Sequence, residues 1–132
     1  MTKFEATFKQ FEGALNRFKE VLNIPKTDIV RDSAIQRFEF TLDLSWKTVK
    51  AFLEEEKGIV CASPKECFRE AYRQGIIDYD NEWLKFVDMR NETAHIYKEE
   101  TAEKIYAHLP NVLKHLEILY KKINRSGAWT RK

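Results

Sequence analysis

The sequence predicts an all-α fold, an antiparallel up-and-down four-helix bundle with one extra short helix. Along two long segments, apolar residues recur at alternating spacings of four and three, and along a third they recur at spacings of three or four, which is typical of a helix buried on one side. No segment alternates apolar and polar residues over the length of a strand. Only four glycines serve the chain of 132 residues, which favours long helices joined by short loops.

The first two helices are bounded by capping and breaking residues. Thr2 and Glu5 form a capping-box pattern that starts the first helix, and Pro25 ends it. Asp28 is expected to cap a second, longer helix, and Gly58 supplies its left-handed stop. The apolar stripes of these helices are Phe4, Phe8, Phe11, Leu15, Phe18 and Leu22, then Ile35, Phe38, Leu42, Trp46, Val49 and Leu53.

A short third helix is signalled by Ser63, Pro64 and Glu66. They combine a cap, a proline at the first helical position and the reciprocal glutamate. Gly75 closes this helix, and the two isoleucines after it should fold back as the hydrophobic contact of the C-cap.

Two more helices complete the predicted bundle. Asp78 or Asp80 should cap the fourth helix, and Thr101 the last one. The last helix carries a third stripe, Ile105, Leu109, Val112, Leu116, Leu119 and Ile123. We expect a single domain over residues 1–124, followed by a loose tail at residues 125–132 where the apolar period is lost.

Composition excludes several classes of protein. Hydrophobic residues make up 43% and charged residues 33%, which is the profile of a globular rather than a disordered chain. The net charge of +2 gives no bulk attraction for long nucleic acids, so a phosphate-binding surface must come from local clustering. Neither a signal-peptide core nor a transmembrane run is present, and we expect a cytoplasmic protein.

The only cysteines are Cys61 and Cys67. Two thiols six residues apart fit neither a zinc ligand set nor a disulfide framework. We therefore expect both to be small hydrophobic residues in a reducing compartment.

The most informative stretch is RNETAHIY, residues 90–97, at the end of the fourth helix. Arginine forks onto phosphate oxygens, and histidine moves protons near neutral pH. On a helix of about 3.6 residues per turn, Arg90 and Tyr97 lie within about 20° of one another. Asn91 and His95 share the adjoining strip, so the four side chains could line one polar surface. The alternative is a solvated helix end with a satisfied histidine.

Several familiar sites are absent. There is neither a Gly-rich phosphate loop nor an H-E-x-x-H zinc helix. His95, His108 and His115 have no partner at metal-ligand spacing, so we expect no metal and no cofactor. Asp78 and Asp80 form a D-x-D pattern, but metal sites with that pattern need strands, and helix capping is the better account.

Two motifs together resemble a known family. Arg90-x4-His95-x-Tyr97 resembles the R-x4–6-H signature of HEPN domains, in the form with a following tyrosine. Upstream, residues 36–47 read QRFEFTLDLSWK and resemble a helix of the nucleotidyltransferase substrate-binding protein family. Asp43 stands where that family is expected to have glutamate, which keeps an acid at the position. The resemblance covers roughly residues 4–124.

The resemblance implies a bundle that forms a homodimer and has a separate minimal nucleotidyltransferase chain as its partner. By analogy, Arg90 would hold phosphate, His95 would act as acid/base or hydrogen-bond donor, and Asn91 would orient them. Tyr97 would be a stacking surface or a hydroxyl that the partner adenylylates. Related HEPN proteins act as metal-independent ribonucleases. All of these residue roles are carried over from the family by analogy of fold.

The neighbouring charges on the second helix leave alternatives open. Arg37, Lys47 and Lys50 either add to a phosphate site or are solvated. Glu39 and Asp43, one turn apart, either belong to the site or pin an arginine, Arg90 or Arg37, inside the bundle.

The favoured function is an accessory subunit that binds a nucleotide or short RNA for a two-component nucleotidyltransferase. The alternative is a ribonuclease toxin of a toxin-antitoxin pair, neutralised by that partner, with Arg90 and His95 as its catalytic residues. A structural adaptor is a third class. Homodimerisation is also expected because three tryptophans and an aromatic-rich first helix exceed what a small bundle needs inside. The sequence leaves open whether any catalysis occurs.

Overall fold

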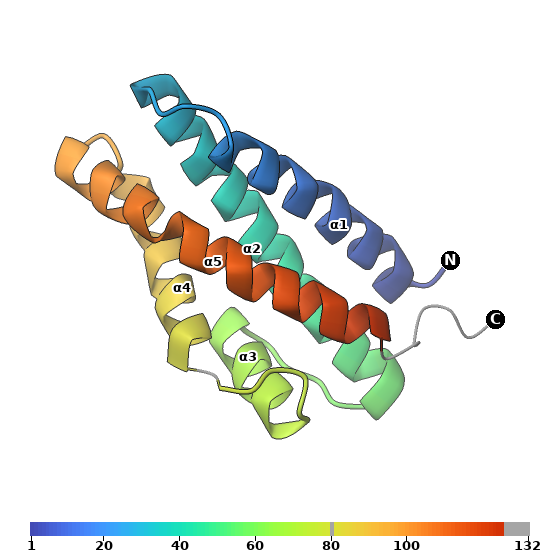
Figure 1. Ribbon diagram of the computed structural model, residues 1–132. Helices are drawn as coiled ribbons and strands as arrows, with labels where there is room; N and C mark the ends of the chain where they lie inside the picture. The colour runs from blue at the N-terminus through green and yellow to red at the C-terminus, as the bar shows by residue number, and fades with distance from the viewer. Residues whose placement is uncertain (80, 126–132) are drawn as a thin grey trace.

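The structure, a computed structural model, describes residues 1–79 and 81–125, and within them it confirms the all-α class. The elements in order are α1 (Lys3–Leu22), α2 (Asp28–Lys57), α3 (Pro64–Arg73), α4 (Asn81–Glu92), the 3-10 turn η1 (Thr93–His95) and α5 (Glu99–Arg125). The long helices α1, α2, α4 and α5 run alternately in opposite directions, and α3 is the extra short helix (Figure 1). α1, α2 and α5 pack against one another, while α3 and α4 pack against α2 and each other.

The capping signals explain most of the helix boundaries. Glu5 N–H donates to Thr2 Oγ1 at 3.1 Å and Thr2 N–H donates to Glu5 Oε1 at 2.8 Å, which confirms the capping box. Gly58 ends α2 with φ at 66°, and Gly75 follows α3 with φ at 74°, both in the left-handed region that favours glycine. Ile76 N–H bonds the Ala71 carbonyl at 2.8 Å, so the chain folds back as predicted.

Two predicted caps were wrong. The cap of α2 is Thr27, whose hydroxyl accepts from Val30 N–H at 3.1 Å, and Asp28 is the first helical residue. An acid there still interacts favourably with the positive end of the helix. α5 begins at Glu99, before Thr101, because Ala102 N–H already bonds the Lys98 carbonyl at 3.1 Å.

Two other boundary predictions fall at the edge of the described chain. α4 begins at Asn81, and the alternative cap at residue 80 lies outside the described residues. Arg125 belongs to α5 rather than to a tail, and residues 126–132 also lie outside the described residues. No helix in the described ranges is long and apolar enough to cross a membrane.

The core lies between α1, α2 and α5 and extends to buried side chains of α3 and α4, such as Phe68 and Phe86. The phenylalanines of the α1 stripe are all 2% exposed or less; they are Phe4, Phe8, Phe11 and Phe18. The apolar stripe of α5 is buried in the same core. The aromatic richness of α1 is therefore used inside one chain. It gives no support to a dimer, although Phe40 on α2 stays 54% exposed.

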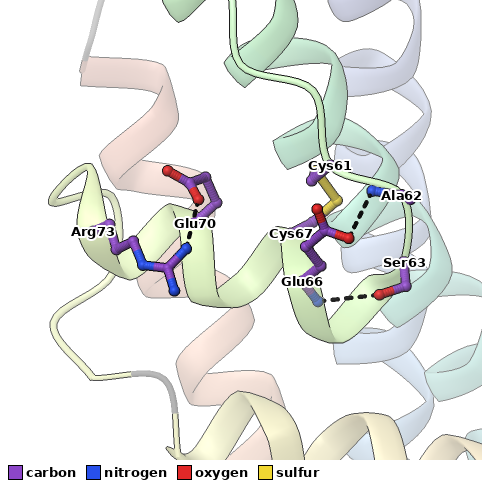
Figure 2. Close-up of a disulfide and its surroundings, with 7 residues drawn as sticks. All are labelled: Cys61, Ala62, Ser63, Glu66, Cys67, Glu70 and Arg73. Carbon is purple, nitrogen blue, oxygen red and sulfur yellow. Dashed lines mark hydrogen bonds and ion pairs between the residues drawn. A yellow bond between two sulfur atoms is a disulfide. The ribbon is translucent and has the colours of Figure 1, made fainter.

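The expectation of two free thiols was wrong, because Cys61 and Cys67 form a disulfide (Figure 2). The chain bends at Ser63, whose hydroxyl accepts from Glu66 N–H at 3.2 Å, and Glu66 in turn accepts from Ala62 N–H at 3.2 Å. This bend lays Cys61 over the first turn of α3, with the two Cα atoms 5.2 Å apart. Both cysteines are buried. The reducing-compartment argument, which assumed free thiols, loses its basis.

The disulfide closes a short loop, so its removal should lower stability moderately. By the loop-closure estimate, a loop of this size contributes about 2 kcal/mol, or roughly 5–10 °C in Tm for a domain of this length. We expect calorimetry to show that loss when the wild type is unfolded and refolded in excess dithiothreitol. Alkylation followed by mass spectrometry should count two thiols after reduction and none before. The Cys61→Ala/Cys67→Ala double variant is the control, and its Tm should be the same with and without dithiothreitol. An unchanged wild-type Tm after verified reduction would contradict the contribution.

Candidate functional site

The motif at residues 90–97 is not one continuous helix, because α4 ends within it. Arg90 lies in the last turn of α4, which stops at Glu92, and the chain then tightens into η1. The Thr93 hydroxyl donates to the Arg90 carbonyl at 2.7 Å at this transition. Because the α-helix does not continue, the seven-residue spacing does not place Tyr97 over Arg90, and the predicted single polar strip does not form.

Arg90 is held by carboxylates of α2. Its Nε and Nη2 atoms donate to the two oxygens of Asp43, each at 3.1 Å, in the bidentate geometry that makes such pairs strong. Nη1 lies 3.2 Å from Glu39 and donates to the Thr93 hydroxyl at 3.2 Å. The hydrogen bond to Asp43 raises the pKa of Arg90 above its ordinary value. The structure therefore shows that Glu39 and Asp43 pair with Arg90 and not with Arg37.

A pocket of about 300 Å³ lies beside this ion pair, between α2, α4 and the start of α3. Of the predicted site residues, Lys47, Arg90 and Asn91 line it together. Trp46 was expected only in the core stripe, but its half-buried ring forms part of the pocket wall. Its position beside Lys47 in the QRFEFTLDLSWK motif is the signal that was available. The complete lining is Leu42, Asp43, Trp46, Lys47, Pro64, Val87, Arg90 and Asn91.

His95 and Tyr97 lie beyond the pocket, in η1 and the turn that follows it. Both are exposed, and Tyr97 is 75% exposed. Their rings contact each other edge to face, with centroids 6.0 Å apart, and the Lys98 ammonium lies 5.9 Å from the centre of the Tyr97 ring. The motif thus supplies a pocket wall from one half and an exposed histidine–tyrosine pair from the other.

Arg37 does not join this site. Its Nη1 atom donates to the Arg17 carbonyl at 2.8 Å and lies 3.4 Å from Glu20, so the side chain is engaged by α1. It lines a separate groove of about 630 Å³ between α1 and α2, where Phe40 is exposed. Arg37 and Arg90 therefore line different pockets, and the structure does not bring Arg37 together with Lys47, Arg90 and Asn91.

The electrostatics of the pocket are nearly balanced. Glu39 and Asp43 offset the charge of Arg90, so among the described residues that line the pocket Lys47 is the cation without an ion-pair partner. Among the described residues, no group of three or more histidine, cysteine, aspartate or glutamate side chains is arranged to hold a metal ion. His115 lies at the edge of the core, with its ring 5.2 Å from that of Phe86.

Comparison with known proteins assigns the chain to a family. The protein-family model described as "nucleotidyltransferase substrate binding protein like" matches residues 4–125 of this chain. A relative named probable ribonuclease HepT, from Haemophilus influenzae, is 34% identical over 109 residues, which cover 76% of this chain and 75% of the relative.

Two solved structures share the fold. A crystal structure from Thermus thermophilus is 35% identical with a TM-score of 0.81, covering 85% of this chain and 97% of that one. A Haemophilus influenzae structure, described as revealing the fold of a substrate binding domain of a nucleotidyltransferase, is 29% identical with a TM-score of 0.69. It covers 92% of this chain and 96% of its own. With both motifs in place and the family model spanning nearly all of the described residues, this chain is a member of the nucleotidyltransferase substrate-binding-protein-like family.

Proposed function

We propose that this chain is an accessory subunit that binds a nucleotide, or the end of a short RNA, for a separate minimal nucleotidyltransferase. The observation that carries the proposal is the pocket lined by Trp46, Lys47, Arg90 and Asn91. An indole face stacks on any base, an ammonium attracts phosphate, and an amide both donates and accepts hydrogen bonds. The pocket volume of about 300 Å³ lies at the small end for ligand sites, which favours one nucleotide over a long strand.

The geometry gives these residues different roles. Arg90 is engaged by Asp43, Glu39 and Thr93, so it shapes the wall and offers few free N–H groups to a ligand. Lys47 is exposed, which makes it the better phosphate contact. Asn91 is exposed on the α4 side of the same pocket and is placed to read a base or ribose edge.

Titration with nucleoside monophosphates tests the binding role. We expect isothermal calorimetry to give saturable binding of at least one of AMP, GMP, CMP and UMP. Lys47→Gln and Asn91→Ala should each weaken it about tenfold, the effect of losing one ligand hydrogen bond or charge contact. Lys50→Gln is the matched control, since Lys50 lies one turn along α2 from Trp46 and does not line the pocket. Absence of binding at millimolar nucleotide, or equal losses in the control, would contradict the proposal.

A second candidate function, metal-independent ribonuclease toxin, is favoured by the HepT relative, which is named a probable ribonuclease. Transesterification of RNA needs a base for the 2′-hydroxyl proton and a cation for the charged phosphorane. One chain offers an exposed His95 and an Arg90 whose charge is offset by two acids. A homodimer with two-fold symmetry could bring two such pairs into one groove, and would then supply a second histidine and a second arginine to the same phosphate.

RNA cleavage separates the two candidates. For the accessory subunit, wild type and His95→Ala should both leave RNA intact, and expression should not be toxic. Cleavage in chelator that yields 2′,3′-cyclic phosphate ends and disappears in folded His95→Ala would instead establish the ribonuclease. The shared-groove mechanism also requires light scattering to report about twice the chain mass of 15.7 kDa. A monomer would contradict that mechanism.

Tyr97 is the proposed contact for the partner chain. The residue is 75% exposed and follows the end of α4, so another protein's active site can reach its hydroxyl. Nucleotidyl transfer there would form a bond from the tyrosine oxygen to the α-phosphorus of ATP and release pyrophosphate. The added phosphate would place negative charge beside Lys98.

Co-incubation with the partner nucleotidyltransferase, ATP and magnesium tests this contact. We expect mass spectrometry to detect one or more added nucleotidyl groups, absent in Tyr97→Phe. Tyr79→Phe is a matched control, because Tyr79 is 76% exposed and lies outside the motif. If the partner binds without modifying the wild type, the toxin analogy fails and the binding role stands. If two folded chains do not bind at all, the proposed partnership is wrong.

A further inference from the structure

The turn that carries His95 and Tyr97 is followed at once by α5. Lys98 N–H bonds the His95 carbonyl at 3.1 Å, and the helical ladder of α5 starts when Ala102 N–H bonds the Lys98 carbonyl at 3.1 Å. Glu99, the first residue of α5, therefore lies only two residues after Tyr97. Any contact that fixes Glu99 also restrains the exposed pair.

Such a contact comes from Arg31, in the first turn of α2. Its Nη1 and Nη2 atoms donate to the two carboxylate oxygens of Glu99 at 2.9 and 3.2 Å, and Nε donates to Asp32 at 3.0 Å. Asp28 lies 3.7 Å and Glu103 4.0 Å from Nη1. The Arg31 side chain is only 3% exposed, whereas the Glu99 side chain is 72% exposed. The beginnings of α2 and α5 lie at the same end of the bundle (Figure 1).

This ion pair stays formed near neutral pH. Hydrogen bonding to Arg31 lowers the pKa of Glu99 below its ordinary value, so the carboxylate remains charged. Losing Glu99 would leave the nearly buried Arg31 guanidinium with Asp32 but without its bidentate contact, so burial favours keeping Glu99 in place.

The motif turn is thus attached on both sides. Upstream, Thr93 bonds Arg90, which is itself held by α2. Downstream, Glu99 bonds Arg31, also on α2. Between these attachments Ile96 packs partly against the core, while the rings of the exposed pair contact each other and Lys98.

We propose that Arg31 is a positioning residue for the functional motif, which sets the place of His95 and Tyr97 through its bidentate contact with Glu99. The idea that this pair is functional rests on the proposed function; the anchoring itself does not. Arg31 lies on α2 far along the chain from the motif, and neither motif resemblance includes it.

Hydrogen exchange measured by mass spectrometry on the full chain tests the anchor. The Glu99→Gln variant changes an exposed side chain and leaves Arg31 paired with Asp32. In this variant, hydrogen exchange over residues 93–100 should accelerate about tenfold or more. Arg31→Lys should act in the same direction, because an ammonium cannot reproduce the bidentate fork. Arg37→Lys is the matched control, as Arg37 lies on the same helix and is engaged by α1. Its exchange over residues 93–100 should match the wild type.

Nuclear magnetic resonance adds a reading at the histidine itself. The chain has three histidines, and His108 and His115 on α5 serve as internal references. In Glu99→Gln we expect the His95 ring resonance to shift, while those of the two references stay in place. A role limited to general stability would not move one histidine alone.

Two results would overturn the proposal. One is wild-type exchange over residues 93–100 together with an unmoved His95 resonance in Glu99→Gln. The other is accelerated exchange spread evenly over all helices, which would make the ion pair a general stabiliser. Neither measurement uses nucleotide, RNA or a partner chain, so failure of the proposed function would show separately, as absence of binding.

Discussion

The ion pair between Arg90 and the two carboxylates of α2 is the constraint on which the candidate site depends. It joins the end of α4 to the middle of α2 through two hydrogen bonds of 3.1 Å to Asp43 and a 3.2 Å contact with Glu39. The pocket lies directly beside it, and the turn into η1 begins three residues later. Without the guanidinium, the two carboxylates, which lie one turn apart on α2, would lose the positive charge that offsets theirs.

The bundle gives this ion pair a rigid base. The phenylalanines of α1 and the aliphatic stripe of α5 are buried against α2, so α2 is covered along much of its length. Both arginine clamps, formed by Arg31 and Arg90, join this covered helix to the chain segments on either side of the motif turn. The disulfide and the Ser63 cap hold a third segment, whose Pro64 forms another part of the pocket wall. Separate elements thus position one small site.

The charge balance of the pocket bears on what it can do. A site for long RNA needs several unpaired cations along a track, because affinity comes from neutralised phosphates. Here the acids of α2 offset most of the charge of Arg90, and Lys47 is the cation that remains among the described lining residues. This favours a ligand with few phosphates, held by stacking and hydrogen bonds as much as by charge. The two halves of the motif are also separate in space. Arg90 and Asn91 line the pocket, whereas His95 and Tyr97 are exposed and do not line it.

The sequence by itself determined the class of fold, the order of the helices and most of their ends, because apolar period and caps such as Thr2, Gly58 and Gly75 are local signals. Residue type and motif also singled out Arg90, Asn91 and Lys47, which the structure places together along one pocket. Tertiary structure decided the rest. Which arginine Asp43 pairs with depended on how α4 docks on α2, and Arg37 is engaged by α1 instead. The Cys61–Cys67 bond needed the bend at Ser63 to bring two Cα atoms together. The roles of Trp46 and Arg31 were hidden for the same reason: periodicity reports which face of a helix is buried, but not which distant side chain meets it there.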